Sequence, residues 1–264
     1  MFAVPSTFVR EMVAMPTVSL FPSSPKQIRG VINLRGMVLP VLDLRIALGM
    51  RSFTEEIEDL VRLLDEREQD HKNWLAELES SVIERREFKL ATDPHKCKFG
   101  MWYDTFKTEN GTLSNSLKHF EKPHQRIHGI AIEVKELEKK GSYEAALSLI
   151  EHTRQSELSQ MIKVFSEVRQ LVREDSREIA LIMDWNERRF AAAVDSIETV
   201  EQFSESDIGK MPESIDTSGN DFVAGIAKRK FDEGLVQILD VMKIMDAGGS
   251  MDLSLMKKDE GEED

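Results

Sequence analysis

The stretch GVINLRGMVLPVLDLRIALG, residues 30–49, decides how the β-rich part of this chain folds. It is rich in valine, isoleucine and leucine, and the pair Arg35-Gly36 divides it into two apolar runs. Short runs of this composition on either side of a turn signal are typical of two joined strands. The stretch therefore predicts two short strands connected at Arg35-Gly36.

Two later stretches have the same character. Residues 178–203, EIALIMDWNERRFAAAVDSIETVEQF, predict further strands, with the polar segment DWNE at 184–187 as a hairpin loop. Residues 222–245, FVAGIAKRKFDEGLVQILDVMKIM, predict two more strands and a short helical end. Strands are therefore expected at both ends of the chain.

The two β-rich ends resemble each other. LPVLDLRIAL (39–48) aligns with VQILDVMKIM (236–245), and Gly30 falls near Gly225 at almost the same offset. Such self-similarity predicts one β domain of two similar halves, although chance similarity among β-rich segments is the alternative.

The repeat also exposes a gap. In the second half IALIMD precedes FAAAVDSIETV, whereas the comparable FAVPSTFVREMV in the first half starts at Met1 with no strand before it. Either the fold manages without that strand or the start of the chain is truncated. An unpaired edge at this place would expose backbone donors and acceptors.

The middle of the chain has a helical period. From about Thr54 to Asp175, apolar residues recur at intervals of three and four, and Gly141-Ser142 separates the last two of three stripes. Three long amphipathic helices and a short segment around Cys97 predict an antiparallel bundle inserted between the β halves. The stripes are Ile57, Leu60, Val61, Leu64, His71, Trp74, Leu75, Leu78 and Val82; Leu113, Leu117, Phe120, His124, Ile127, His128 and Ala131; and Tyr143, Ala146, Leu147, Ile150, Leu158, Met161, Phe165, Val168 and Leu171.

Composition narrows the classes of function. The 264 residues carry 35 basic and 48 acidic side chains, a formal net charge of -13. This charge disfavours general binding to nucleic acid and to anionic membrane surfaces. A single cysteine cannot form an internal disulfide, and no apolar run approaches the roughly 20 residues that span a bilayer. With no signal peptide at the start, we expect a soluble cytoplasmic protein.

The helical insert contains a candidate metal site. His124 and His128 are four residues apart and share a helix face, and His71 lies on an apolar stripe and so points inward. With Cys97 they form a plausible set of zinc ligands. Three alternatives stay open at this point: His71 as a satisfied core residue, the histidine pair as a solvated pair, and Cys97 as a small buried residue. We expect His95, His119 and His152 to be exposed.

Three motifs in the insert resemble the chemoreceptor zinc-binding (CZB) domain. HKNW (71–74), CKFGMWY (97–103) and PHQRIH (123–128) are similar in order and spacing to that family's elements, and Tyr143-Glu144-Ala145-Ala146 resembles it too. The resemblance implies a helical bundle that encloses zinc, with Trp74, Gly100 and Trp102 as packing and turn residues. The zinc ligands that it implies are His71, Cys97, His124 and His128.

The β-rich ends resemble the chemotaxis coupling protein CheW. The similarity covers IRGVINLRGMVLPVLDLR (28–45), AAAVDSIETV (191–200) and the stretch 222–245. It implies two small SH3-like β-barrels without catalytic residues, which bridge chemoreceptor tips and the histidine kinase CheA. It also implies a partner-binding surface of Val9, Gly30 and Arg35, although Arg35 could instead brace its own turn and Gly30 could serve backbone geometry.

The sequence as a whole predicts an α+β multidomain protein that is an adaptor and not an enzyme. We expect residues 1–52 and 176–246 to form the CheW-like module, residues 53–175 the zinc-binding bundle, and residues 247–264 an acidic disordered tail. The function implied is coupling of chemoreceptors to CheA with sensing of zinc or of oxidants such as hypochlorous acid. The alternative is a scaffold in which the insert and any zinc are structural. Whether bundles pair into a homodimer stays open.

Overall fold

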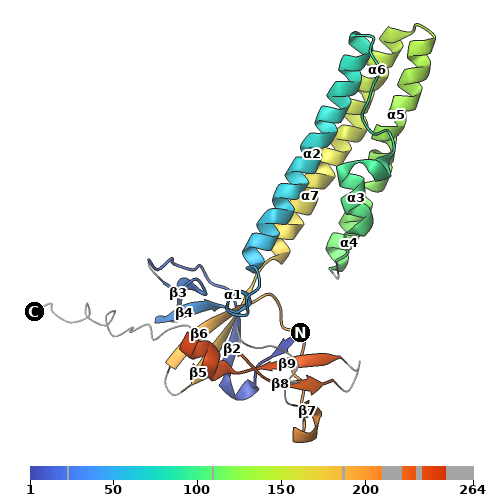
Figure 1. Ribbon diagram of the computed structural model, residues 1–264. Helices are drawn as coiled ribbons and strands as arrows, with labels where there is room; N and C mark the ends of the chain where they lie inside the picture. The colour runs from blue at the N-terminus through green and yellow to red at the C-terminus, as the bar shows by residue number, and fades with distance from the viewer. Residues whose placement is uncertain (23, 109, 186–187, 210–221, 230–233, 248–264) are drawn as a thin grey trace, which may run out of the picture. The chain divides into compact units, whose positions relative to one another are not determined.

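The computed structural model describes residues 1–22, 24–108, 110–185, 188–209, 222–229 and 234–247 (Figure 1). The chain divides into two compact units, each described here by itself. One unit combines Met1–Phe53 with Arg177–Asp264, and the other is Thr54–Ser176. The predicted acidic tail at 247–264 lies, apart from Ala247, outside the described residues.

Two sheets build the first unit. The larger sheet has the order β2-β5-β6-β4-β3, in which β4 and β6 are parallel and the other neighbours are antiparallel. The smaller sheet has the order β1-β9-β8-β7, in which only β1 and β9 are parallel. The strands are β1 (Phe2–Ala3), β2 (Val9–Ala14), β3 (Ile28–Leu34), β4 (Met37–Asp43), β5 (Ile179–Trp185), β6 (Arg188–Val194), β7 (Ile208–Gly209), β8 (Val223–Lys228) and β9 (Leu235–Leu239). Short helical elements are η1 (Ser6–Phe8), α1 (Leu44–Ala47), η4 (Glu205–Asp207) and α8 (Val241–Ala247).

The hairpin predicted at Arg35-Gly36 is confirmed. Strands β3 and β4 pair up to Leu34 and Met37, so the turn has two residues. Both turn residues have positive φ, 54° at Arg35 and 86° at Gly36. Positive φ at both positions is typical of the two-residue turns whose twist matches that of the flanking strands. The side-chain oxygen of Asn33 accepts a hydrogen bond of 2.9 Å from the Gly36 N–H and holds the turn.

The internal repeat is also confirmed, because the hairpins β3–β4 and β8–β9 share an irregularity. A bulge lies just before Gly30, which pairs with Val41, and an equivalent bulge lies just before Gly225, which pairs with Ile238. In both halves the aspartate that follows, Asp43 or Asp240, accepts a hydrogen bond from a backbone N–H in a short helix. The two hairpins and the short helices that follow them are therefore the same structural unit built twice.

The second half departs from the prediction at one place. Strands β5 and β6 lie where 178–203 predicts them, and part of the expected DWNE loop, residues 186–187, lies outside the described residues. Residues 195–203, however, form no strand. Their counterpart in the first half, β2, pairs with β5, and among the described strands of the smaller sheet none corresponds to β5. A segment of strand-like composition forms a strand only where a neighbouring strand can make hydrogen bonds with its backbone.

Arg29 ties three parts of the larger sheet together, and it provides a test of this fold. Its guanidinium donates to the Asp43 carboxylate at the end of β4 and to both carboxylate oxygens of Glu178, just before β5. All three side chains are largely buried. We expect Arg29→Lys to lower the free energy of unfolding by about 2 kcal/mol, because one ammonium cannot replace a guanidinium fork between two carboxylates. Urea denaturation measures this change.

A matched control lies six residues later. Arg35 pairs with Glu11, but its side chain is 71% exposed, and exposed pairs contribute little. We expect Arg35→Lys to change stability by no more than about 0.5 kcal/mol. Equal losses in the two variants would show that the buried network does not hold the sheet.

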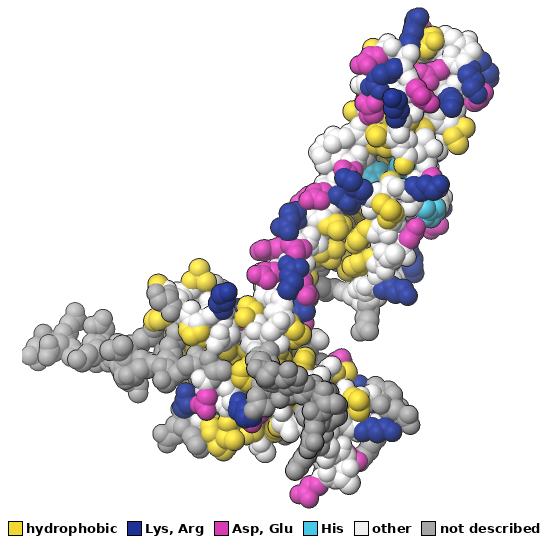
Figure 2. All heavy atoms as spheres, in the orientation of Figure 1, with side chains coloured by type: hydrophobic (Ala, Val, Ile, Leu, Met, Phe, Trp, Pro, Cys, Tyr) yellow, Lys and Arg dark blue, Asp and Glu magenta, His cyan; other side chains and the backbone are white. Residues whose placement is uncertain are grey.

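The second unit is the predicted helical bundle (Figure 1). Its long outer helices are linked by ion pairs of Arg169 with Asp65 and Glu68. Arg154, in the π-helical segment before the second of them, pairs with Glu79. On the face drawn in Figure 2, charged side chains cover much of the outside and apolar side chains show between the helices. The elements are α2 (Phe53–Ile83), η2 (Pro94–Lys96), α3 (Lys98–Thr105), α4 (Gly111–Lys118), α5 (Glu121–Lys139), α6 (Tyr143–Thr153), the π-helical η3 (Arg154–Leu158) and α7 (Ser159–Asp175).

One of the three predicted long helices is wrong in detail. The stripe from Leu113 to Ala131 spans two helices, α4 and α5, which meet at His119 and Phe120. The cause is Pro123, which has no N–H to donate to the carbonyl of His119 and whose ring crowds that carbonyl. Among the described residues, no helix is both long enough and apolar enough to cross a membrane.

Candidate metal centre

The bundle brings the four candidate ligands into one cluster. Each of the four residues offers one ligand atom, and these atoms all lie within 4.8 Å of one another. The residues come from three separate elements: His71 from α2, Cys97 from the N-terminus of α3, and His124 and His128 from α5. The three imidazoles are buried and the thiol is half-buried.

Two of the histidines are oriented by backbone carbonyls. His71 Nδ1 lies 2.6 Å from the carbonyl oxygen of Arg67, one turn earlier in α2. His128 Nδ1 lies 3.1 Å from the carbonyl oxygen of Ala91, in the connection after α2. A carbonyl can only accept, so each Nδ1 carries the proton and each Nε2 is left with a lone pair. Neither Nε2 has a hydrogen-bond partner in the described part of the chain.

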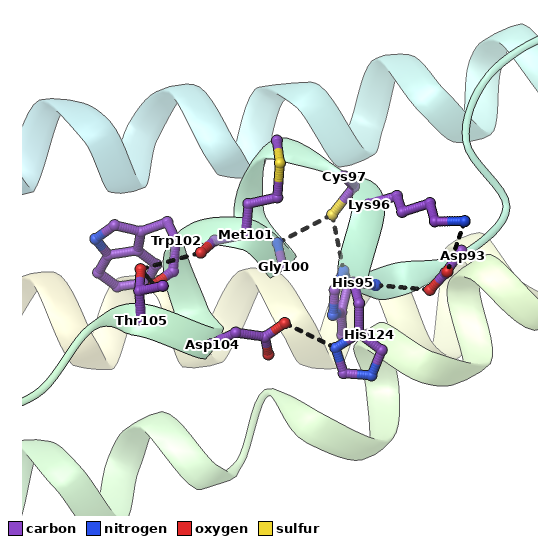
Figure 3. Close-up of polar contacts among 10 residues, drawn as sticks. All are labelled: Asp93, His95, Lys96, Cys97, Gly100, Met101, Trp102, Asp104, Thr105 and His124. Atoms are coloured by element: carbon purple, nitrogen blue, oxygen red, sulfur yellow. Dashed lines mark hydrogen bonds and ion pairs between the residues drawn. The ribbon is translucent and has the colours of Figure 1, made fainter.

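The thiol meets the third histidine at the start of a helix (Figure 3). Cys97 Sγ lies 3.2 Å from His124 Nε2 and accepts a hydrogen bond of 3.1 Å from the Gly100 N–H, so Cys97 caps α3. Burial raises the pKa of the Cys97 thiol, and the backbone N–H groups of Gly100 and Phe99 act against that shift. A cation beside the sulfur would favour the thiolate much more strongly.

Burial also keeps the imidazoles neutral. It lowers the pKa of His71, that of His124 to about 3 and that of His128 to about 4, and the proximity of the histidines to one another adds to the last two shifts. At neutral pH the rings are therefore uncharged, which is the form that binds a metal.

The cluster has the chemistry of a zinc site. Buried acceptor atoms without a partner cost free energy, and two Nε2 atoms are in this state. Zn²⁺ takes four nitrogen or sulfur ligands in a tetrahedron, so a cation at the centre of the cluster would satisfy both atoms and the thiolate. His71 is therefore not a satisfied core histidine, and His124 and His128 are not a solvated pair.

The other three histidines lie outside the cluster, as predicted. His95 is exposed, and its Nδ1 lies 2.9 Å from the Asp104 carboxylate, although it is only two residues from Cys97 (Figure 3). His119, in the turn after α4, and His152, on α6, are exposed.

Sequence reasoning missed the carbonyls of Arg67 and Ala91, which orient the rings. The Ala91 oxygen also accepts a hydrogen bond of 2.8 Å from the Trp74 indole, so one carbonyl is shared by Trp74 and His128. No side-chain signal could have found these two positions, because any residue supplies a carbonyl. Trp74 itself was placed on the apolar stripe by the sequence and, by the resemblance, among the packing residues, but its hydrogen bond to this carbonyl was not predicted.

Trp74→Phe tests this shared carbonyl. The substitution keeps an aromatic ring but removes the indole N–H. The segment after α2 that contains Ala91 then loses one of the hydrogen bonds that fix its carbonyl. We expect zinc affinity to fall about tenfold, as for other residues that orient a ligand. The control is Trp102→Phe, because the Trp102 indole forms no hydrogen bond within the described ranges and its loss should leave zinc affinity unchanged. Competition against a coloured chelator measures both, and equal affinities in the two variants would contradict the positioning role of Trp74.

The three predicted partner-binding residues have different surroundings. Arg35 is exposed at its turn and pairs with Glu11, whereas Val9 packs partly into the core and Gly30 is buried. A Cβ on Gly30 would lie 2.1 Å from the Ser19 carbonyl oxygen, and φ is +145°, so backbone geometry alone requires glycine there. Partner binding by these residues stays a prediction, with Arg35 the most accessible.

Comparisons with known proteins match both units. Residues 71–135 match the chemoreceptor zinc-binding domain family, and residues 1–70 and 157–248 match the CheW-like domain family. A probable chemotaxis protein CheW of Rhizobium etli is 46% identical over 50 residues, which are 19% of this chain and 32% of that relative. The chain thus matches about a third of that relative's length.

Two solved structures match the chain at low similarity. The scaffolding protein TtCheW from Thermoanaerobacter tengcongensis has a TM-score of 0.40 at 14% identity, over 91% of this chain and 77% of its own. The regulatory CZB domain of DgcZ has a TM-score of 0.36 at 17% identity, over 44% of this chain and 98% of its own.

Proposed function

This chain belongs to the CheW-like family, and from that premise we propose that it is an adaptor that couples chemoreceptors to the histidine kinase CheA and binds zinc in its inserted bundle. CheW-like domains are chemotaxis scaffolds, so the family itself supports coupling rather than catalysis. The insert adds a match to a zinc-binding family.

The observation that carries the zinc proposal is the cluster of four ligand atoms within 4.8 Å. His71 and His128 would bind through Nε2, whose lone pairs have no other partner among the described residues. His124 would bind through Nε2, which already faces the sulfur, and Cys97 through Sγ. Zinc, when bound, would hold the Cys97 sulfur as a thiolate.

The same cysteine supports a role in sensing oxidants. A thiolate is more readily oxidised than a thiol, and hypochlorous acid converts it to a sulfenic acid with release of chloride. Cys97 is half-buried, whereas the three histidines are buried, so it is the most exposed of the four candidate ligands. Oxidation would remove one of four ligands and leave three buried imidazoles that burial keeps neutral.

Chain connectivity supports a link between the zinc site and coupling. Helix α2 starts at Phe53, shortly after α1 and β4, and α7 ends at Asp175, shortly before β5. The two helix ends line one hollow, which includes Thr54, Ile57, Arg173 and Ser176. A change in the spacing of α2 and α7 on zinc loss would therefore act on the chain segments that lead from β4 and α1 into α2 and from α7 into β5.

The experiment has two steps. Elemental mass spectrometry of protein purified without added metal should find about one zinc per chain, and a variant with both Cys97→Ala and His124→Ala should have lost it. The affinity of zinc-loaded and zinc-depleted protein for the CheA regulatory domain and for a receptor tip is then compared. Different affinities of the two forms would support sensing. If the protein binds zinc but the two forms have equal affinities, the bundle is a structural insert of a scaffold.

A further inference from the structure

Helix α7 carries none of the four candidate zinc ligands. They come from α2, the N-terminus of α3 and α5, whereas α7 is the helix that leads into β5. An effect of zinc binding on α7 must therefore pass through side chains that α7 packs against the ligands or their neighbours. Helix α7 has a single aromatic residue, Phe165, and its side chain is fully buried.

The Phe165 ring contacts an aromatic ring from each of the three regions that carry a candidate ligand. Its centroid lies 6.3 Å from that of His71 in α2 and 5.4 Å from that of Phe99 in α3. It lies 4.6 Å from the centroid of Phe120, whose carbonyl accepts a hydrogen bond of 3.0 Å from the His124 N–H at the start of α5. Phe165 thus touches one candidate ligand directly and is linked to a second through Phe120.

Phe99 extends these contacts to the histidines. It is buried, and its ring meets those of His71 and His124 edge to face, with centroids 5.5 Å and 4.9 Å apart. In a close-packed interior a ring cannot turn without displacing its neighbours. A change in the orientation of His71 is therefore passed to Phe165 both directly and through Phe99.

Zinc binding would change what holds the His71 ring. Its Nε2 is a buried acceptor with no partner in the described part of the chain, and such an atom costs free energy. A metal ion on Nε2 would remove that cost and fix the ring against Phe165. A metal-free ring instead gains by turning toward any donor or water that it can reach, which loosens its packing against Phe165.

We propose that Phe165 is the positioning residue through which α7 responds to zinc binding, an inference that rests on the zinc site proposed above. Its ring supports that of His71, and the end of α7 precedes β5. Coupling free energies are reciprocal, so the factor by which Phe165 raises zinc affinity equals the factor by which zinc favours the packed arrangement of Phe165. Zinc affinity therefore measures the coupling.

Phe165→Leu in the full chain tests this coupling. Leucine keeps the position apolar but removes the ring that contacts His71, so we expect zinc affinity to fall about tenfold in competition against a coloured chelator. The control is Val168→Ala, one turn later on α7, because it also truncates a buried side chain of the same core cluster but removes no ring. We expect its zinc affinity to be unchanged. Phe165→Met, which also lacks the ring, should behave like Phe165→Leu and replaces it if that variant does not fold.

Hydrogen exchange provides a second measurement. We expect saturating zinc to slow exchange of the α7 amides in the natural protein and in Val168→Ala. In Phe165→Leu, saturating zinc should slow exchange around His71 as before, but the slowing in α7 should be several-fold smaller. Equal zinc affinities of Phe165→Leu and Val168→Ala, or an undiminished effect of zinc on α7 in Phe165→Leu, would overturn the inference. A natural protein that binds no zinc would instead refute the proposed zinc site itself, and this inference with it.

Discussion

His71→Ala is expected to lower zinc affinity by more than about 100-fold, beyond the loss seen when a residue that merely orients a ligand is changed. The His71 ring is fixed by the Arg67 carbonyl, and its Nε2 has no partner in the described ranges. Alanine would remove one of the four proposed ligands. Competition against a coloured chelator at pH 7 measures the affinity.

The same variant should lose the stabilisation that zinc gives. A ligand that binds only the folded protein adds about 2.7 kcal/mol to stability at a hundred times its Kd. We expect excess zinc to raise the midpoint temperature of thermal unfolding of the natural protein and to leave that of the His71→Ala variant unchanged. His152→Ala is the control, because His152 is exposed on α6 and should behave like the natural protein. Equal zinc shifts in all three proteins would exclude His71 as a ligand.

Gly100→Ala is expected to lower the free energy of unfolding by about 3 kcal/mol, at the upper end of the cost of overpacking. A Cβ on Gly100 would lie 1.9 Å from the carbonyl oxygen of Pro94 and 2.9 Å from its carbonyl carbon. Both are backbone atoms, so neither can turn aside as a side chain could. The Gly100 N–H also donates to Cys97 Sγ, so zinc affinity should fall at least about tenfold as the sulfur moves.

The control for Gly100→Ala is Gly129→Ala. Gly129 is in α5 beside His128, and a Cβ there would meet nothing within 4 Å. Because glycine inside a helix costs about 0.5–1 kcal/mol relative to alanine, this change should stabilise the bundle. Urea denaturation in excess zinc compares the two. A Gly100→Ala protein as stable as the Gly129→Ala protein would show that the turn from Pro94 to Gly100 is not held as tightly as the structure indicates.

Local signals predicted the elements whose structure depends on nearby residues. The hairpin at Arg35-Gly36 and the periodic helices α2 and α7 lie where the sequence places them. Residues 197–202 were wrongly expected to be a strand because their composition is suitable, but no strand in the described part of the chain pairs with them. The break between α4 and α5 could have been predicted, since Pro123 conflicts with the carbonyl four residues earlier.

The candidate metal centre likewise has some features that the sequence predicts and some that it does not. Spacing on helix faces placed His71, His124 and His128 inward, and the structure brings them to Cys97. The carbonyls of Arg67 and Ala91, which set the ring orientations, could not be predicted because the backbone carries no sequence signal. The π-helical segment Arg154–Leu158 was likewise not foreseen, because a local shift in helical hydrogen bonding leaves no residue pattern.

X-ray absorption at the zinc K edge tests the central claim most directly, because it identifies the atoms bound to the metal. For protein purified with its own zinc, we predict one sulfur at about 2.3 Å and three nitrogens at about 2.0–2.1 Å. The sulfur contribution should be absent from the Cys97→Ala variant. A zinc surrounded only by nitrogen and oxygen in the natural protein, or a sulfur signal that survives in Cys97→Ala, would contradict a centre formed by Cys97 and the three buried histidines.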